Sequence, residues 1–97
     1  MSAAHAVIVQ GAIDLLADPA HRYGILEELV IPELRALPGY RNSLWLTDGA
    51  TTGTCIVVFD DAEHARAGFE VLTRDGGPPT LAAGIHEVEA EDPTPGP

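Results

Sequence analysis

Four short apolar runs are spaced along the chain and are separated by polar or amphipathic stretches. The first, residues 5–13, is rich in β-branched side chains, which favours a buried strand over a helix. Two more, residues 40–47 and 54–59, flank the turn-forming sequence DGATTG, and the last starts near Leu81 and ends near Ala90. This pattern predicts four strands, of which the first and third are the most apolar.

An amphipathic helix is predicted between the first and second strands. Apolar residues recur at three- and four-residue spacing over residues 23–37, and Asp18 followed by proline is a suitable helix start. The Pro-Gly pair at 38–39 ends this helix. Pro32 lies inside it and is expected to kink it or to open the preceding turn, because proline has no backbone N–H to donate.

A second amphipathic helix is predicted after the third strand. Asp60 and Glu63 have the spacing of a capping box, which satisfies backbone donors at a helix start. An apolar stripe then runs along one side of the helix and consists of Ala62, Ala65, Phe69 and Leu72. The segment RDGGPP ends the helix and leads to the fourth strand.

The predicted order of elements is therefore β-α-β-β-α-β, an α+β fold. With right-handed crossovers this order gives the ferredoxin-like arrangement, an antiparallel four-stranded sheet with two helices on one face and the first and third strands at its centre. Both faces of these central strands are apolar, whereas two helices cover only one face. A homodimer that packs the second face against its own copy is therefore expected.

Composition sets the expected domain organisation and argues against several partners. For 97 residues we expect one domain, residues 1–90, followed by a disordered acidic and proline-rich tail, residues 91–97. The formal charge of −10, with no lysine, argues against binding to nucleic acid or to an anionic membrane surface. No apolar run has the roughly 20 residues of a membrane span, and the N-terminal segment lacks signal-peptide features, which predicts a cytoplasmic protein.

The cysteine and histidine content points away from thiol and metal chemistry. Cys55 is the only cysteine and lies in an apolar strand, so the expected role is a buried hydrophobic residue and not a nucleophile. The four histidines are scattered without the spacing of a metal site, and the glycines do not form a phosphate-binding loop. Neither a metal nor another cofactor is therefore expected.

Two segments, IPELRALPGYRNSLWLTDG at residues 31–49 and CIVVFDDAEHARAGFEVL at residues 55–72, resemble the dimeric α+β barrel proteins typified by the antibiotic biosynthesis monooxygenase domain. The resemblance rests on the Pro-Gly-Tyr turn at 38–40 and the Phe-Asp-Asp junction at 59–61. It implies a homodimer whose two sheets form a barrel, with a cavity between sheet and helices or at the sheet interface. The haem-degrading branch of the family is disfavoured, because the first strand here offers Gln10 where that branch has Asn.

The second strand carries most of the candidate site residues. Its alternation puts Tyr40, Asn42, Leu44 and Leu46 on one face and Arg41, Ser43, Trp45 and Thr47 on the other. Leu44 and Leu46 are expected to face the helices, so that Trp45, Ser43 and Arg41 face the barrel side. The candidates for substrate binding are Trp45, Ser43 and Gln10, and those for catalysis are Trp45, Arg41, His86 and Tyr40.

Each of these candidates also has a structural interpretation. Trp45 can fill the core or rim of the dimer while Arg41 pairs with an acid of the partner, because aromatic and arginine side chains are enriched at interfaces. Gln10 can satisfy a backbone group at the strand end. His86 shares its face with Val88, which would bring it into a cavity.

Two functions are compatible with these features. One is a small-molecule enzyme, such as the cofactor-independent monooxygenases of the family, that acts on an aromatic or polyketide-like substrate. The other is a non-catalytic dimeric module that binds a small molecule or serves as an accessory protein. The second is motivated by the lack of paired carboxylates and of a nucleophile with an adjacent base.

Overall fold

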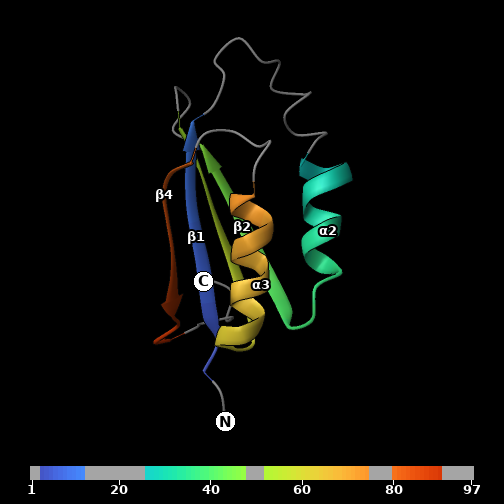
Figure 1. Ribbon diagram of the computed structural model, residues 1–97, viewed down its shortest axis with the longest axis vertical. Coiled ribbons are helices and arrows are strands. Elements are labelled where there is room, and N and C mark those ends of the chain that lie inside the picture. Colours follow the sequence, from blue (N-terminus) through green and yellow to red (C-terminus); the bar gives the residue numbers. More distant parts are fainter. Residues whose placement is uncertain (1–2, 13–25, 48–51, 75–79, 91–97) are drawn as a thin grey trace, which may run out of the picture.

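The computed structural model describes residues 3–12, 26–47, 52–74 and 80–90. The elements in this part of the chain are β1 (His5–Ala12), η1 (Leu26–Val30), α2 (Ile31–Arg35), β2 (Tyr40–Thr47), β3 (Thr52–Phe59), α3 (Ala62–Thr73) and β4 (Thr80–Glu87). The strands form one antiparallel sheet in the order β2-β3-β1-β4 (Figure 1). The predicted α+β class is confirmed, and the two most apolar strands are central.

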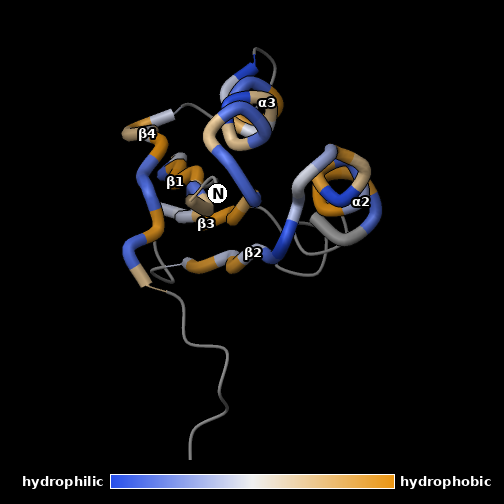
Figure 2. Tube along the Cα trace, turned by 90° about the horizontal axis from the view of Figure 1, so that it is seen from below, coloured by the Kyte–Doolittle hydropathy of each residue, from blue (hydrophilic) through white to orange (hydrophobic). Residues whose placement is uncertain are grey.

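Alternate residues of the central strands form the core together with the helices. The register sets Val7 opposite Val57 and Val9 opposite Cys55. The buried cluster consists of Val7, Val9, Leu34, Cys55, Val57, Phe59 and Ala65. Because Leu34 belongs to α2 and Ala65 to α3, both helices lie over the same face of the sheet, as Figure 2 shows. We call this the helix face.

Phe59 is the largest fully buried side chain of the core, and α3 has a glycine where it crosses the ring. A Cβ built on Gly68 would overlap the Phe59 ring atoms Cε2 and Cζ. The missing side chain therefore lets the helix backbone approach the sheet closely. Burying a side chain of this size contributes roughly 1.5–3 kcal/mol to folding, so the contact is central to the stability of the fold.

The first described helix contains the irregularity that the sequence predicts at Pro32. The turn from Leu26 to Val30 is π-helical, and Pro32 lies in the first turn of α2, which follows directly. Proline has no backbone N–H to donate to the carbonyl four residues earlier, so that α-helical hydrogen bond is missing. The turn before Pro32 is correspondingly widened. The predicted helix start at Asp18 lies outside the described residues, as does the tail at 91–97.

The start of α3 differs by one residue from the prediction. The N-cap is Asp61, whose backbone is extended and whose Oδ1 accepts a hydrogen bond of 2.8 Å from the backbone N–H of His64. Asp60 is engaged elsewhere, because its backbone N–H donates to the carbonyl of Gly39 at 2.9 Å. The predicted capping box of Asp60 with Glu63 is therefore wrong.

An exposed ion pair joins the two helices. Arg74, directly after α3, donates from both terminal nitrogens to the two carboxylate oxygens of Glu33 in α2, at 2.6 and 2.7 Å. This hydrogen bond lowers the pKa of Glu33. Two parallel bonds fix the relative orientation of the groups, which positions the end of α3 beside α2.

The second strand faces the opposite way from the prediction. Trp45 pairs with Cys55 and Ser43 with Val57, so both side chains point to the helix face, where Trp45 packs on the core cluster. Leu44 and Leu46 point away from the helices and are 57% and 50% exposed. The expectation that the leucines face the helices and Trp45 the other side is therefore wrong.

The physical reason lies at the start of β2. The pairing with β3 shifts between Tyr40 and Asn42, so that Arg41 is the extra residue of a β-bulge. Tyr40 consequently shares the helix face with Ser43 and Trp45, although strict alternation would separate them. The space beside α2 is filled by the larger aromatic side chains, and the leucines are left on the other side.

The second face of the sheet carries no helix among the described residues. We call it the open face. In the strand registers its side chains belong to Ala6, Ile8, Gln10, Ala12, Asn42, Leu44, Leu46, Thr52, Thr54, Ile56, Val58, Ala82, Gly84 and His86. In the part of the chain described here, none of the helices has the length and hydropathy to cross a membrane.

Candidate functional site

The residues singled out from the sequence separate onto two faces of the sheet. Tyr40, Ser43 and Trp45 gather on the helix face, whereas Gln10 and His86 lie on the open face. Arg41 is exposed at the bulge in the edge strand β2 and belongs to neither group. The six candidates therefore do not form one site, and each face has to be considered by itself.

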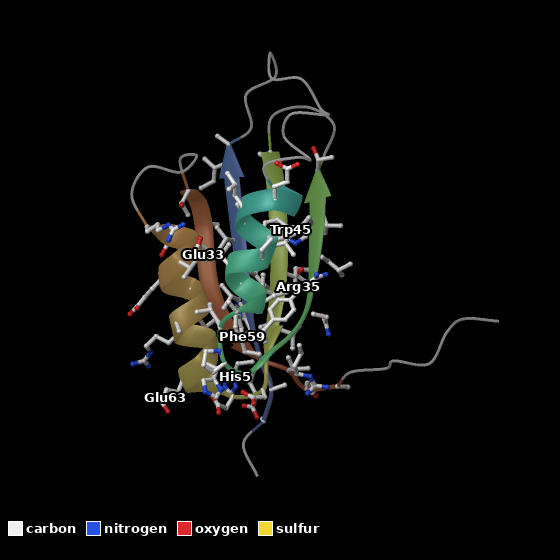
Figure 3. The ribbon with its side chains drawn as sticks, turned by 90° about the vertical axis from the view of Figure 1, so that its right-hand side faces the viewer. His5, Glu33, Arg35, Trp45, Phe59 and Glu63 are labelled. Carbon is white, nitrogen blue, oxygen red and sulfur yellow. The ribbon has the colours of Figure 1, made fainter. Side chains whose placement is uncertain are left out.

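The helix-face group is held together by its own polar atoms. Ser43 Oγ accepts a hydrogen bond of 2.9 Å from Trp45 Nε1 and forms another, also of 2.9 Å, with the Tyr40 hydroxyl. The Tyr40 ring meets Phe59 edge to face, with ring centroids 6.1 Å apart. Figure 3 shows Trp45 and Phe59 on the side of the strands that α2 covers. These hydrogen bonds satisfy the polar atoms of the partly buried indole and phenol groups, so both aromatic side chains can pack against the core cluster.

The open face contains a hollow with polar side chains at its wall. Its volume is about 310 Å³, at the lower end of the range for small-molecule sites. The lining residues come from β1, β3 and β4 and are Ile8, Gln10, Thr54, Ala82, Ala83, Gly84 and His86. The floor is apolar, and the groups that can form hydrogen bonds are an amide, a hydroxyl and an imidazole.

The hollow exists because β4 has small residues where β1 has larger ones. Gly84 lies opposite Ile8, and Ala82 lies opposite Gln10. A Cβ built on Gly84 would lie 3.1 Å from Nε2 of His86, so the imidazole lies across the glycine. The absence of a side chain at position 84 thus allows His86 to lie low against the sheet and to line the hollow.

A third polar group lies at the junction of β3 and α3. His64 Nδ1 lies 2.6 Å from Asp60 Oδ1 and 3.3 Å from Asp61 Oδ2. The hydrogen bond to Asp60 raises the pKa of His64, and the charges of Asp61, Asp60 and Glu63 act in the same direction. A protonated imidazole between carboxylates is favourable because it carries the opposite charge.

The same junction is tied to the start of β2 through Gly39. This glycine has φ of +79°, and a Cβ there would overlap the Asp60 carboxylate and the His64 ring. A positive φ is accessible to glycine at little cost, whereas other residues are strained there. The Pro-Gly turn and the start of α3 are therefore packed together, and we call Gly39, Asp60, Asp61 and His64 the junction cluster.

Within the described residues, the junction cluster also contains a possible metal-ligand set. One ligand atom from each of Asp60, Asp61 and His64 lies within 4.8 Å of the others. This grouping differs from the prediction that the histidines form no metal site, and its signal in the sequence is the D-D-x-x-H spacing across a helix start. Asp61 Oδ1 and His64 Nδ1 already take part in the cap and the hydrogen bond, which accounts for the cluster as a structural contact.

Cys55 occupies the position that the sequence predicts for it. The side chain is buried in the core cluster opposite Val9 and Trp45. Burial raises the pKa of its thiol, so the reactive thiolate is disfavoured. The residue packs as a small hydrophobic group.

No model of a known protein family matches the chain, and no significantly similar sequence was found among curated proteins.

Proposed function

We propose that this protein is a ferredoxin-like homodimer of the α+β barrel type that binds a small flat organic molecule on its open sheet face. The observation that carries the proposal is the hollow of about 310 Å³ with His86 and Gln10 at its wall. It is the place in the described chain where predicted site residues, concave shape and an apolar floor coincide. The likeness of the Pro-Gly-Tyr turn and the Phe-Asp-Asp junction to the monooxygenase-domain family supports the same assembly.

The charge distribution supports association through the open face. The chain carries a formal charge of −10, so two copies repel each other wherever their acidic surfaces meet. Among the described residues that the strand registers pair on the open face, none is Asp, Glu, Arg or Lys, and Arg41 lies outside this pairing at the bulge. The two leucines of the open face are at least half exposed in the single chain. A second copy would cover this apolar surface without bringing like charges together.

The lining chemistry defines the class of ligand. An imidazole, an amide and a hydroxyl can each donate or accept a hydrogen bond, and the floor between them is apolar. A flat aromatic molecule with a hydroxyl or carbonyl group matches this set, because its ring covers the floor while its oxygen meets the polar wall. Phenols and aromatic polyketide-like compounds have this form.

Native mass spectrometry followed by titration with hydroxylated naphthalenes tests the proposal. We expect a dimer, and we expect His86→Ala and Gln10→Ala each to weaken binding about tenfold, the effect of losing a hydrogen bond to the ligand. Tyr40→Phe is the matched control, because its hydroxyl lies on the helix face. If Tyr40→Phe weakens binding and His86→Ala does not, the ligand site lies on the helix face and the proposal is wrong.

A second candidate function is catalysis in the same hollow, as in cofactor-independent monooxygenases. The observation that favours it is the imidazole of His86 in the same wall as the Gln10 amide. The imidazole can take a proton from an activated methylene group of the ligand while the amide binds its carbonyl oxygen. Reaction of that carbon with O₂ would give a carbonyl group and water, so the substrate itself supplies the electrons.

Oxygen uptake with an anthrone separates the two candidates. An oxygenase would consume O₂ with the parent protein and lose most of this activity in His86→Gln, which keeps a polar side chain but has no imidazole base. Binding without O₂ uptake would leave the protein as a binding module. Uptake that is equal in parent and His86→Gln would show that His86 is not the base.

A further inference from the structure

The two edges of the open face differ in side-chain size. One row of paired residues runs Leu44, Ile56, Ile8 and Gly84 from the β2 edge to the β4 edge. The next row runs Leu46, Thr54, Gln10 and Ala82. In both rows a leucine is at the β2 edge and a glycine or alanine is at the β4 edge.

This difference between the edges gives the open face a ridge and a hollow. The ridge consists of Leu44 and Leu46, which are 57% and 50% exposed. The hollow lies at the other edge of the face, where Gly84 and Ala82 are among its lining residues. The ridge and the hollow occupy the same two rows, so they lie at the same height along the strands.

Only one way of placing two such faces together brings the ridge over the hollow. A two-fold axis parallel to the strands exchanges the β2 and β4 edges, so each ridge lies over the hollow of the other copy. An axis across the strands would instead place ridge on ridge and hollow on hollow. Sheets packed face to face are rotated by about 30°, which moves the edge strands by about half the spacing between rows. Each leucine then still lies over the β4 segment.

We propose that the second copy completes the ligand site by supplying its roof, with the partner's Leu44 and the partner's Leu46 over the hollow at Gly84 and Ala82. This inference rests on the proposed homodimer. The hollow of a single chain is open to solvent, and a ligand there would leave one face of its ring in water. The two leucines would cover that face, and the two-fold axis would give the dimer two equivalent sites.

A second copy fits this surface better than an unrelated partner does. A partner drawn to a chain of charge −10 would be basic, and its cations would contact carboxylates. Neither row contains a carboxylate. The surface is instead complementary to itself, which is what an isologous interface requires.

Cysteine pairs test the arrangement directly. Leu44→Cys protein is mixed with Gly84→Cys protein and treated with a short bismaleimide, and Leu46→Cys is paired with Ala82→Cys in a second mixture that leaves the His86 contact intact. Sheets packed face to face lie about 10 Å apart, a distance that such a linker spans but a disulfide does not. Each variant carries one introduced cysteine and Cys55 is buried, so a link forms only between two chains. We expect cross-linked dimers in both mixtures and little self-linking of Leu44→Cys. The matched control is Leu29→Cys mixed with Gly84→Cys, because Leu29 is 65% exposed but lies in η1 and not on the open face.

The outcomes separate this inference from the proposed function. Self-linking of Leu44→Cys without linking in the two mixtures would place ridge on ridge, and a monomeric protein would remove the roof; either result overturns the inference. Linked dimers that bind no hydroxylated naphthalene would keep the arrangement and overturn the proposed function.

If the dimer arrangement and ligand binding both hold, Leu44→Ala combined with Leu46→Ala should weaken ligand binding about tenfold or more, because apolar contact is lost. Unchanged affinity in a protein that still dimerises would show that the leucines do not form the roof.

Discussion

The two faces of the sheet are both apolar in sequence, but only one is a core. On the helix face the side chains interlock with α2 and α3, and Val7, Val57 and Phe59 have no exposed surface. On the open face the central residues are flanked by Leu44 and Leu46, which are largely exposed. Hydrophobic content alone therefore does not show which face stabilises the monomer. The difference lies in which side chains find a complementary element within the same chain.

The largest expected effect is the difference in stability lost when a large side chain is removed from the helix face or from the open face. Phe59→Ala should lower the free energy of unfolding by about 3–5 kcal/mol, because it removes the central side chain of the core and leaves a cavity. Leu44→Ala should change it by less than about 1 kcal/mol in the monomer and should weaken dimerisation instead. Urea denaturation and sedimentation velocity measure the two effects. Equal destabilisation by both variants, with no change in subunit number, would contradict this view of the faces.

The same substitution at two glycines sharpens the comparison. Gly68→Ala should destabilise the protein by about 1–3 kcal/mol, because the new methyl group overlaps the Phe59 ring in a packed core. Gly84→Ala on the open face should cost less, since it meets only the far end of the His86 ring. Thermal unfolding of both variants measures the difference. A larger loss for Gly84→Ala would mean that the open face is packed more tightly than the helix face.

The hydrogen bonds around Ser43 provide a smaller test. Ser43→Ala removes the partner of the Trp45 indole N–H and of the Tyr40 hydroxyl. We expect a loss of about 1–2 kcal/mol in the free energy of unfolding and unchanged ligand affinity. Fluorescence reports the change cleanly, because Trp45 is the only tryptophan. Lost ligand binding in a stable Ser43→Ala protein would place the ligand on the helix face.

The junction cluster should give the smallest effect and a dependence on pH. The pKa of His64 is raised in the folded state, so its stabilising contribution is fully present below the unfolded value of about 6.5. It is lost as the pH rises through the higher folded value. The melting temperature of the parent should therefore exceed that of His64→Ala by more at about pH 5.5 than at about pH 9. A difference that is constant with pH would show that the contact does not depend on charge.

The sequence predicted the elements of the sheet well because each strand is marked by composition. β2 begins at Tyr40 and ends at Thr47, as the apolar run and the Pro-Gly turn indicate. The buried role of Cys55 followed from its strand, and the widened turn before Pro32 followed from the chemistry of proline. These features depend on local sequence, and local sequence was sufficient for them.

The candidate site was predicted less well because it depends on which residues of β2 face the helices. A bulge at Arg41 cannot be recognised from alternation alone, and the assumption that leucines face the core reversed the assignment of Trp45. The hollow at Gly84 depends on pairing between strands that are far apart in sequence. The junction cluster likewise required the Pro-Gly turn to lie against the start of α3. Such features are set by tertiary contacts.

Because of the bulge at Arg41, the number of residues at the start of β2 decides which of its side chains reach the core. Deleting one residue there would force either Tyr40 away from Phe59 or Ser43 and Trp45 out of the core. In the second case β2 would keep its composition and its pairing with β3. Its leucines would then face the helices, and Ser43 and Trp45 would lie on the open face. A point substitution at Arg41 is therefore expected to be tolerated more readily than a single-residue insertion or deletion.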